Sequence, residues 1–216
     1  MSETLSLPET RLDYQTCPLV AAQPGIWIAD QIAQRRNSFA VAHYTELRGE
    51  IDRSCLERAI RQGLAEADTV QAQFYESADG VPQQRLPLRA DPAQVAPAEW
   101  LDFSQRPDAE QAALALMEDD LAQPLPADGE RPLYRQAVIR VGAGRWFWYQ
   151  RFHHIMLDGF SFDAVTRRIA DIYRALRQGK RRRRRRLPRS ARWWRSTVSG
   201  KARRRRSGRR CSGSSG

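Results

Sequence analysis

The spacing of hydrophobic residues predicts four helices in the first 179 residues. In the first, second and fourth of them, apolar positions recur every three or four residues, which is the period of an amphipathic helix. Pro24 suits the first turn of the first helix, and Asp52 and Asp108 stand where N-caps are expected. The predicted helices cover residues 24–34, 53–66, 108–121 and 161–176.

Runs rich in β-branched and aromatic residues predict strands between these helices. The clearest are residues 133–141 and 145–152, which a glycine-containing turn joins into a hairpin. Residues 90–107 contain several prolines and favour a connection with a short apolar patch at 100–103. Further strands are predicted at 39–47, 69–75 and 83–88. Because helices and strands mix throughout, the pattern indicates a layered α/β or α+β domain.

Composition adds limits on the class of protein. The chain has 216 residues, of which 41% are hydrophobic and 28% charged, as in globular proteins. The first residues lack the basic and apolar regions of a secretory signal, and no apolar run reaches the ~18 residues of a membrane span. Three cysteines, an odd number without metal-ligand spacing, favour a reducing compartment. We therefore expect a cytoplasmic protein without membrane contact.

The charge is divided sharply along the chain. The whole sequence carries a formal net charge of +11. Residues 1–179 hold 19 arginines and all 25 acidic residues, so that part is at −6. Residues 180–216 hold the other 17 basic residues and no acid. One interpretation is a disordered tail that binds nucleic acid and other polyanions non-specifically, with Trp193 and Trp194 stacking on bases.

The pattern His-His-x-x-x-Asp-Gly at residues 153–159 is the strongest chemical signal. An imidazole titrates near neutral pH and can accept and return a proton, so this pair suits acyl transfer. Asp158 can bond an imidazole or an arginine, and Gly159 allows a backbone conformation that a side chain hinders. Two alternatives remain: a purely structural histidine pair and a zinc site. Neighbouring side chains on a strand point to opposite faces, so we predict no metal.

This motif resembles the active-site motif of nonribosomal peptide synthetase condensation domains and their chloramphenicol acetyltransferase-like relatives. Residues 18–27 (PLVAAQPGIW) resemble the first motif of that family, an AQ…W segment at the start of a helix. Residues 67–74 (ADTVQAQF) stand at the second motif and depart from its commoner wording, RHExLRTxF. The stretches VAAQPGIW, VAHY, WYQRFHH and DGFSF are similar to the subgroup found in enterobactin-type siderophore synthetases.

The resemblance implies a fold and a reaction. The fold is one lobe of the chloramphenicol acetyltransferase-like α/β sandwich, and the reaction forms an amide between an acyl donor and an aminoacyl acceptor. Both substrates are attached to 4'-phosphopantetheine arms of carrier proteins, and no cofactor is bound directly. In the siderophore subgroup the donor is a 2,3-dihydroxybenzoyl group and the acceptor a seryl group.

The same resemblance assigns roles to residues. His154 is the catalytic histidine, as a general base or as a positioning and electrostatic group. His153 and Asp158 are structural, with Asp158 paired to an arginine elsewhere in the fold. Gly159 lies near the reaction centre and offers its backbone N–H.

Boundaries follow from where the resemblance begins and ends. We expect a loose N-terminus at 1–17, the N-terminal lobe of a condensation domain at 18–179, and a disordered basic tail at 180–216. The second lobe, which supplies the other wall of the site and the partner of Asp158, is expected to be missing, so the product is expected to be inactive alone. The alternative function is a non-catalytic protein that binds nucleic acid through its tail.

The tail also has a genetic interpretation, which we favour. It is built almost entirely from residue types with GC-rich codons. Read one nucleotide earlier, codons for residues 193–200 can spell V-V-A-E-Y-R-Q-W, and the family has a similar stretch at this distance after the motif. Tryptophan has a single codon, so Trp193 and Trp194 fix the second valine. We therefore expect that the tail arises from a frameshift and that DNA downstream encodes the missing lobe in another frame.

Overall fold

The computed structural model describes residues 14–33, 39–89, 91–127 and 132–179. Within them, the four helices predicted from the hydrophobic pattern are all present, with boundaries that differ by two residues or fewer. They are α1 (Gln23–Ile32), α2 (Arg53–Glu66), α3 (Ala109–Ala122) and α4 (Gly159–Arg177).

A four-stranded sheet with the order β2-β7-β6-β5 forms the centre of the fold. The predicted hairpin supplies its middle, and Gly144 takes a positive φ of 60° in the turn. The β5 strand lies parallel to β6 and was predicted only as an apolar patch, because four residues between prolines carry no clear periodicity. The strands are β2 (Ala40–Arg48), β5 (Glu99–Asp102), β6 (Tyr134–Gly142) and β7 (Arg145–His153).

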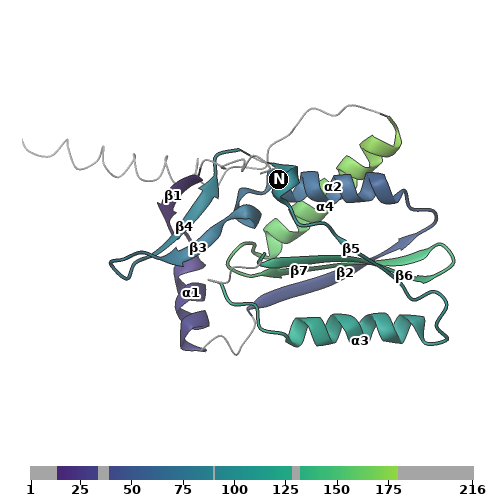
Figure 1. Cartoon of the computed structure of the whole chain (residues 1–216), viewed down its shortest axis with the longest axis horizontal. Coiled ribbons are helices and arrows are strands. Elements are labelled where there is room, and N and C mark those ends of the chain that lie inside the picture. Colours follow the sequence, from purple (N-terminus) through teal and green to yellow (C-terminus); the bar gives the residue numbers. More distant parts are fainter. Residues whose placement is uncertain (1–13, 34–38, 90, 128–131, 180–216) are drawn as a thin grey trace, which may run out of the picture.

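Helices cover both faces of this sheet (Figure 1): α2 and α4 lie on one face and α3 on the other. Side chains of the aromatic strand β7 pack into the cores on both faces of the sheet. Trp148 and Phe152 join the core beneath α2 and α4, whereas Phe147 and Tyr149 join the core beneath α3. Burial on both faces explains why β7 has a continuous apolar run where a one-sided strand would alternate.

The helices α2 and α4 approach each other closely. Gly63 of α2 lies against Ile169 of α4, so that a Cβ built on Gly63 would stand 2.3 Å from Ile169 Cγ1. Nearby, the Arg168 guanidinium binds Glu66 through two hydrogen bonds of 2.6 and 3.1 Å. Both side chains are less than a tenth exposed. Close backbone packing and a buried ion pair therefore fix α4, the helix that follows the histidine motif.

A second, three-stranded sheet has the order β1-β4-β3. Its strands are β1 (Tyr14–Pro18), β3 (Gln73–Glu76) and β4 (Pro82–Pro87). Residues 14–17 were predicted as part of a loose N-terminus, but they pair with β4. The predicted strand at 69–75 is also corrected, since its first half is the short 3-10 helix Asp68–Gln71. Pairing with β4 decides the first case and a short helical turn the second, and side-chain periodicity indicates neither.

Helix α3 buries one narrow face, formed by Ala109, Ala113 and Met117. Alanine and leucine occur on all sides of this helix, so its pattern is nearly uniform. Asp108 forms no side-chain cap and instead pairs with Arg106.

Among the described residues, no helix has both the length and the apolar character needed to cross a membrane. The predicted basic tail at 180–216 lies outside the described residues.

Candidate active site

The motif at 153–159 joins the end of β7 to the start of α4. His153 is fully buried, whereas His154, Asp158 and Gly159 are exposed. The two histidines therefore face different surroundings, as the alternation of side chains along a strand predicts. Within the described part of the chain, no group of three or more potential metal ligands occurs.

His153 is held from two sides. Its Nδ1 accepts a hydrogen bond from the Ile155 N–H at 3.0 Å. Its Nε2 faces Asp30 Oδ1 of α1 at 3.8 Å, and the Asp30 side chain is also fully buried. Burial lowers the pKa of His153, although the nearby Asp30 carboxylate opposes this effect. We conclude that the imidazole is neutral near pH 7 and carries its proton on Nε2, because Nδ1 is an acceptor.

His154 is exposed and is held to the loop through one ring nitrogen. Its backbone N–H donates to the Phe39 carbonyl at 2.6 Å, which ties it to the start of β2. Its Nδ1 lies 3.0 Å from the Leu157 carbonyl oxygen. A carbonyl only accepts, so Nδ1 must carry the proton and the neutral ring leaves the Nε2 lone pair available. This is the arrangement that a proton-accepting histidine requires.

Asp158 begins the helix α4. Its carboxylate accepts a 2.8 Å hydrogen bond from the Ser161 N–H, as an N-cap residue does. Hydrogen bonding to Ser161 lowers the pKa of Asp158. No arginine among the described residues bonds Asp158; the predicted partner belongs to the second lobe and stays a prediction. Within the described part, the carboxylate acts as a helix cap.

Gly159 differs from its predicted conformational role. Its φ is not positive, and a Cβ at this position would meet no atom within 4 Å. The backbone itself therefore does not require glycine. What glycine provides is open space beside the exposed face of the motif. As the first residue of α4, it also has an N–H that the helix cannot use internally.

Helix α1 supports the motif loop, which the sequence did not reveal. Gln23 is buried and donates from Nε2 to the Ile155 carbonyl at 3.0 Å. Its Oε1 accepts a hydrogen bond from the Val20 N–H at 2.9 Å. Together with Asp30, it gives α1 two polar contacts to residues 153–155. The AQ…W segment contained the signal for Gln23, but no local pattern marked Asp30.

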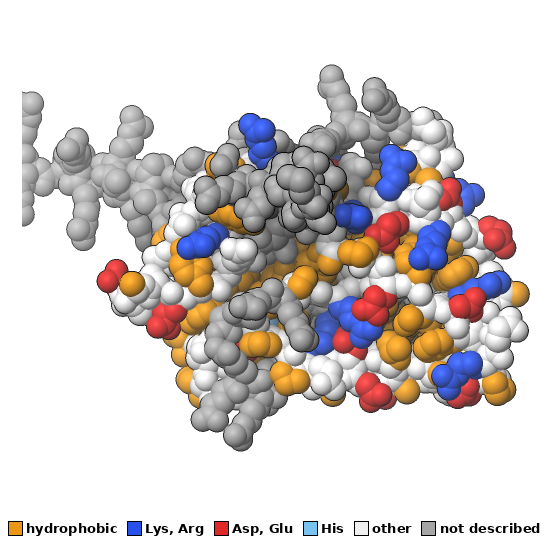
Figure 2. All heavy atoms as spheres, in the orientation of Figure 1, with side chains coloured by type: hydrophobic (Ala, Val, Ile, Leu, Met, Phe, Trp, Pro, Cys, Tyr) orange, Lys and Arg blue, Asp and Glu red, His pale blue; other side chains and the backbone are white. Residues whose placement is uncertain are grey.

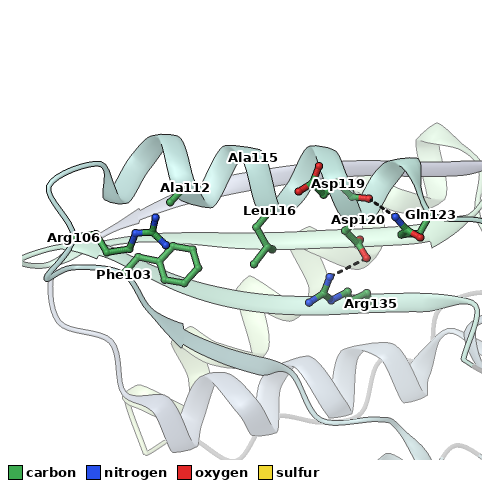
Figure 3. A pocket seen from close by; sticks show the side chains of 9 residues that line it. All are labelled: Phe103, Arg106, Ala112, Ala115, Leu116, Asp119, Asp120, Gln123 and Arg135. Atoms are coloured by element: carbon green, nitrogen blue, oxygen red, sulfur yellow. Dashed lines mark hydrogen bonds and ion pairs between the residues drawn. The ribbon is translucent and has the colours of Figure 1, made fainter.

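Two cavities of the described part lie away from His154. One of about 580 Å³ runs along α3, where Figure 3 shows Leu116 and Phe103 on its apolar side and the Asp120–Arg135 ion pair at one end. A second, of about 800 Å³, shares Asp120, Gln123 and Arg135 with it. His154 lines neither cavity. The candidate site is thus identified by its chemistry and not by the size of a hollow.

Comparison with known proteins decides the family. The family model of the condensation domain matches residues 14–206. The chain belongs to the condensation domain family. Enterobactin synthase component F of Escherichia coli O157:H7 is 45% identical over 167 residues, which are 77% of this chain and 12% of that protein. The chain is therefore related to nonribosomal peptide synthetases of siderophore biosynthesis, whose condensation domains form amide bonds.

Solved structures agree with this family. The starter condensation domain of rhizomide synthetase RzmA has a TM-score of 0.77 and 33% identity, covering 87% of this chain and 46% of that one. A mutant of the same domain, solved in complex with C8-CoA, has a TM-score of 0.67 and 36% identity, covering 77% and 37%. The fold is therefore the chloramphenicol acetyltransferase-like α/β fold predicted from the sequence. The chain spans less than half the length of these domains.

The alternative function, nucleic-acid binding, receives no support from these comparisons. Figure 2 shows acidic and basic side chains interspersed over the described surface on the visible face, without a large region of one sign. Nucleic-acid interfaces are instead strongly positive. The basic tail on which that alternative rests lies outside the described residues.

Proposed function

We propose that residues 18–179 form the part of a condensation site that carries the catalytic residue, and that this residue is His154. The observation that carries the proposal is the state of its ring. Nδ1 is committed to the Leu157 carbonyl, the side chain is exposed, and Nε2 is left as an acceptor. His153 is buried and serves as support, and Asp158 caps α4.

The proposed step is the attack of an amine on a thioester. The nitrogen of the aminoacyl acceptor forms a bond to the carbonyl carbon of the acyl donor, and the carbon–sulfur bond breaks. His154 Nε2 accepts the proton that the amine loses and returns it to the departing thiolate. Gly159, with open space on its outer side, offers its backbone N–H toward the carbonyl oxygen that becomes negative in the transition state.

The substrates proposed are acyl and aminoacyl groups on phosphopantetheine arms of carrier proteins. A relative solved with C8-CoA supports an acyl thioester as donor. The similarity to enterobactin synthase component F supports a 2,3-dihydroxybenzoyl donor and a seryl acceptor. The arm belongs to the substrate, so the site itself needs no bound cofactor.

We propose further that a second lobe completes the site. His154 is exposed, and Phe160, in the first turn of α4, is 90% exposed. Both side chains belong to the segment that carries the motif and the start of α4. These exposures support a partner surface over the loop, which would also exclude water from the thioester.

A chimera tests this proposal. Residues 18–179 would replace the matching segment of the E. coli enterobactin synthase component F, with both carriers loaded, and mass spectrometry would detect the amide. We expect amide from the 2,3-dihydroxybenzoyl donor and less from an aliphatic donor. A folded chimera that forms no amide with any donor would contradict the function. Equal use of both donors would contradict only the donor assignment.

The basic tail stays a separate, sequence-based proposal: we infer that residues 180–216 derive from a frameshift. Sequencing the coding DNA across codons 170–200 and onward tests it. A condensation-domain sequence continuing in another frame is expected. An unshifted frame with nothing of the family downstream would overturn the proposal and make the tail a genuine part of the protein.

A further inference from the structure

The side chain of Asp30 is a buried carboxylate that the proposed chemistry does not use. It lies on α1, about 120 residues before the motif, and is fully buried. Burying a carboxylate is costly unless hydrogen bonds compensate, so its partners are informative. Oδ2 accepts a hydrogen bond from the Ala127 N–H at 3.0 Å. Oδ1 points toward His153 Nε2 at 3.8 Å.

The two facing atoms complement each other. Neither Asp30 Oδ1 nor His153 Nε2 has another hydrogen-bond partner in the described part of the chain. Because the Ile155 N–H donates to Nδ1, the proton of the neutral ring lies on Nε2 and faces the carboxylate. An approach of about 1 Å would turn this contact into a charge-assisted hydrogen bond.

His153 transmits this contact to the loop that presents His154. Its Nδ1 holds the Ile155 N–H, and its carbonyl accepts from the Met156 N–H at 3.0 Å. These bonds close the turn whose far end, the Leu157 carbonyl, receives the Nδ1–H of His154. A ring flip or a change of tautomer at His153 would remove the first of them.

We propose that Asp30 is a positioning residue: by fixing the tautomer and place of His153, it holds the 153–157 turn that orients His154. The proposal rests on the proposed function only in taking His154 as the catalytic residue. It concerns a residue that touches neither substrate nor the reacting atoms, and it makes α1 a part of the active-site scaffold.

The exchange Asp30→Asn is the sharpest perturbation, because it changes charge and acceptor count with almost no change in size. A carboxylate can accept from both the Ala127 N–H and the His153 Nε2–H, whereas an amide has a single oxygen and turns an N–H₂ donor toward one of these two donors. Asp30→Glu keeps both acceptors and tests rescue. Ile60→Val, in the core beneath α2 and α4, is a control for general loosening of the fold.

The readout is the imidazole nitrogen spectrum of the full chain with ¹⁵N-labelled histidine, at pH 8. The protein has three histidines, so each ring can be assigned, and His43 serves as an internal reference. In the wild type we expect His153 as the Nε2–H tautomer and His154 mainly as the Nδ1–H tautomer. In Asp30→Asn, the Nδ1–H form of His154 should fall from the major to the minor form. Asp30→Glu should restore it, and Ile60→Val should leave it unchanged.

Several results would overturn the proposal. A wild-type spectrum with His153 protonated on Nδ1 would do so without any variant, even if Asp30→Asn failed to fold. So would an unchanged His154 signal in a folded Asp30→Asn protein, or an equal change in Ile60→Val. An active chimera together with such a result would refute only the role of Asp30. An inactive chimera with the expected spectra would refute the function and leave the Asp30–His153 contact in place.

Discussion

The contact between Gly63 and Ile169 allows a quantitative test of how α4 is held in place. In the exchange Gly63→Ala, the new methyl group would stand 2.3 Å from Ile169 Cγ1 and 3.4 Å from Ile169 Cα. The first atom is not the free end of a flexible chain, because isoleucine branches at Cβ and is stiff. The helices must separate or Ile169 must leave its rotamer.

Two opposing effects set the size of the change. Overpacking in a core costs about 1–3 kcal/mol, and a contact this short belongs at the upper end. Alanine is favoured over glycine in a helix by about 1 kcal/mol. We therefore expect Gly63→Ala to lower the free energy of unfolding by about 1–2 kcal/mol. For a chain of this length, that lowers the melting temperature by about 2–8 °C.

Thermal and urea unfolding of the full chain measure this change, with Gly25→Ala as the matched control. A Cβ at Gly25, in α1, would meet no atom within 4 Å, so this exchange should be neutral or stabilising. In a protein that already carries Ile169→Ala, adding Gly63→Ala should have no steric cost and should show only the gain in helix propensity. If Gly63→Ala stabilised the protein as Gly25→Ala does, the close α2–α4 contact would be refuted.

Three further predictions concern charge. Hydrogen bonds from the Cys55 N–H and Ser54 lower the pKa of Asp52 to about 2, so its contribution to stability is complete above about pH 4 and is lost as the pH falls toward 2. Asp52→Asn should therefore reduce the fall of the urea midpoint between pH 5 and 2.5, and an unchanged fall would contradict this role of Asp52. Arg168→Met leaves Glu66 buried without its partner and should lower the free energy of unfolding in urea by about 3–5 kcal/mol. Adding Glu66→Leu should recover most of this loss, and a double variant no more stable than Arg168→Met would disprove the pairing. Removing residues 180–216 should abolish retention on heparin at low salt, since the remaining part is at −6; retention of the shortened chain would show that the folded part binds polyanions.

The sequence predicted those parts of the fold that local chemistry determines. The helix from Arg53 to Glu66 was placed correctly because its cap, Asp52, and its apolar spacing agree. The short strand β5 was missed because its parallel pairing with β6 is a distant contact. The nearly uniform apolar character of α3 gives no signal for its buried face.

The active-site motif shows the same division. Its position between a strand and a helix follows from the residues around it, as does the opposite orientation of its two histidines. The contacts of Asp30 could not be predicted, because they join α1 to a loop more than 120 residues away. Gly159 was assigned a backbone role that its φ does not support, while Asp158 has a local role as a helix cap.

The most direct test of the account is the single-turnover rate of amide formation in the chimera for His154→Ala and Arg174→Ala. Arg174 lies on the same helix, α4, with its side chain 70% exposed, and is the matched control. Loss of a general base lowers a rate by about 10²–10⁴-fold, and we expect a fall of this size for His154→Ala alone. An unchanged rate in His154→Ala, or an equal fall in both variants, would contradict the claim that His154 is the catalytic residue.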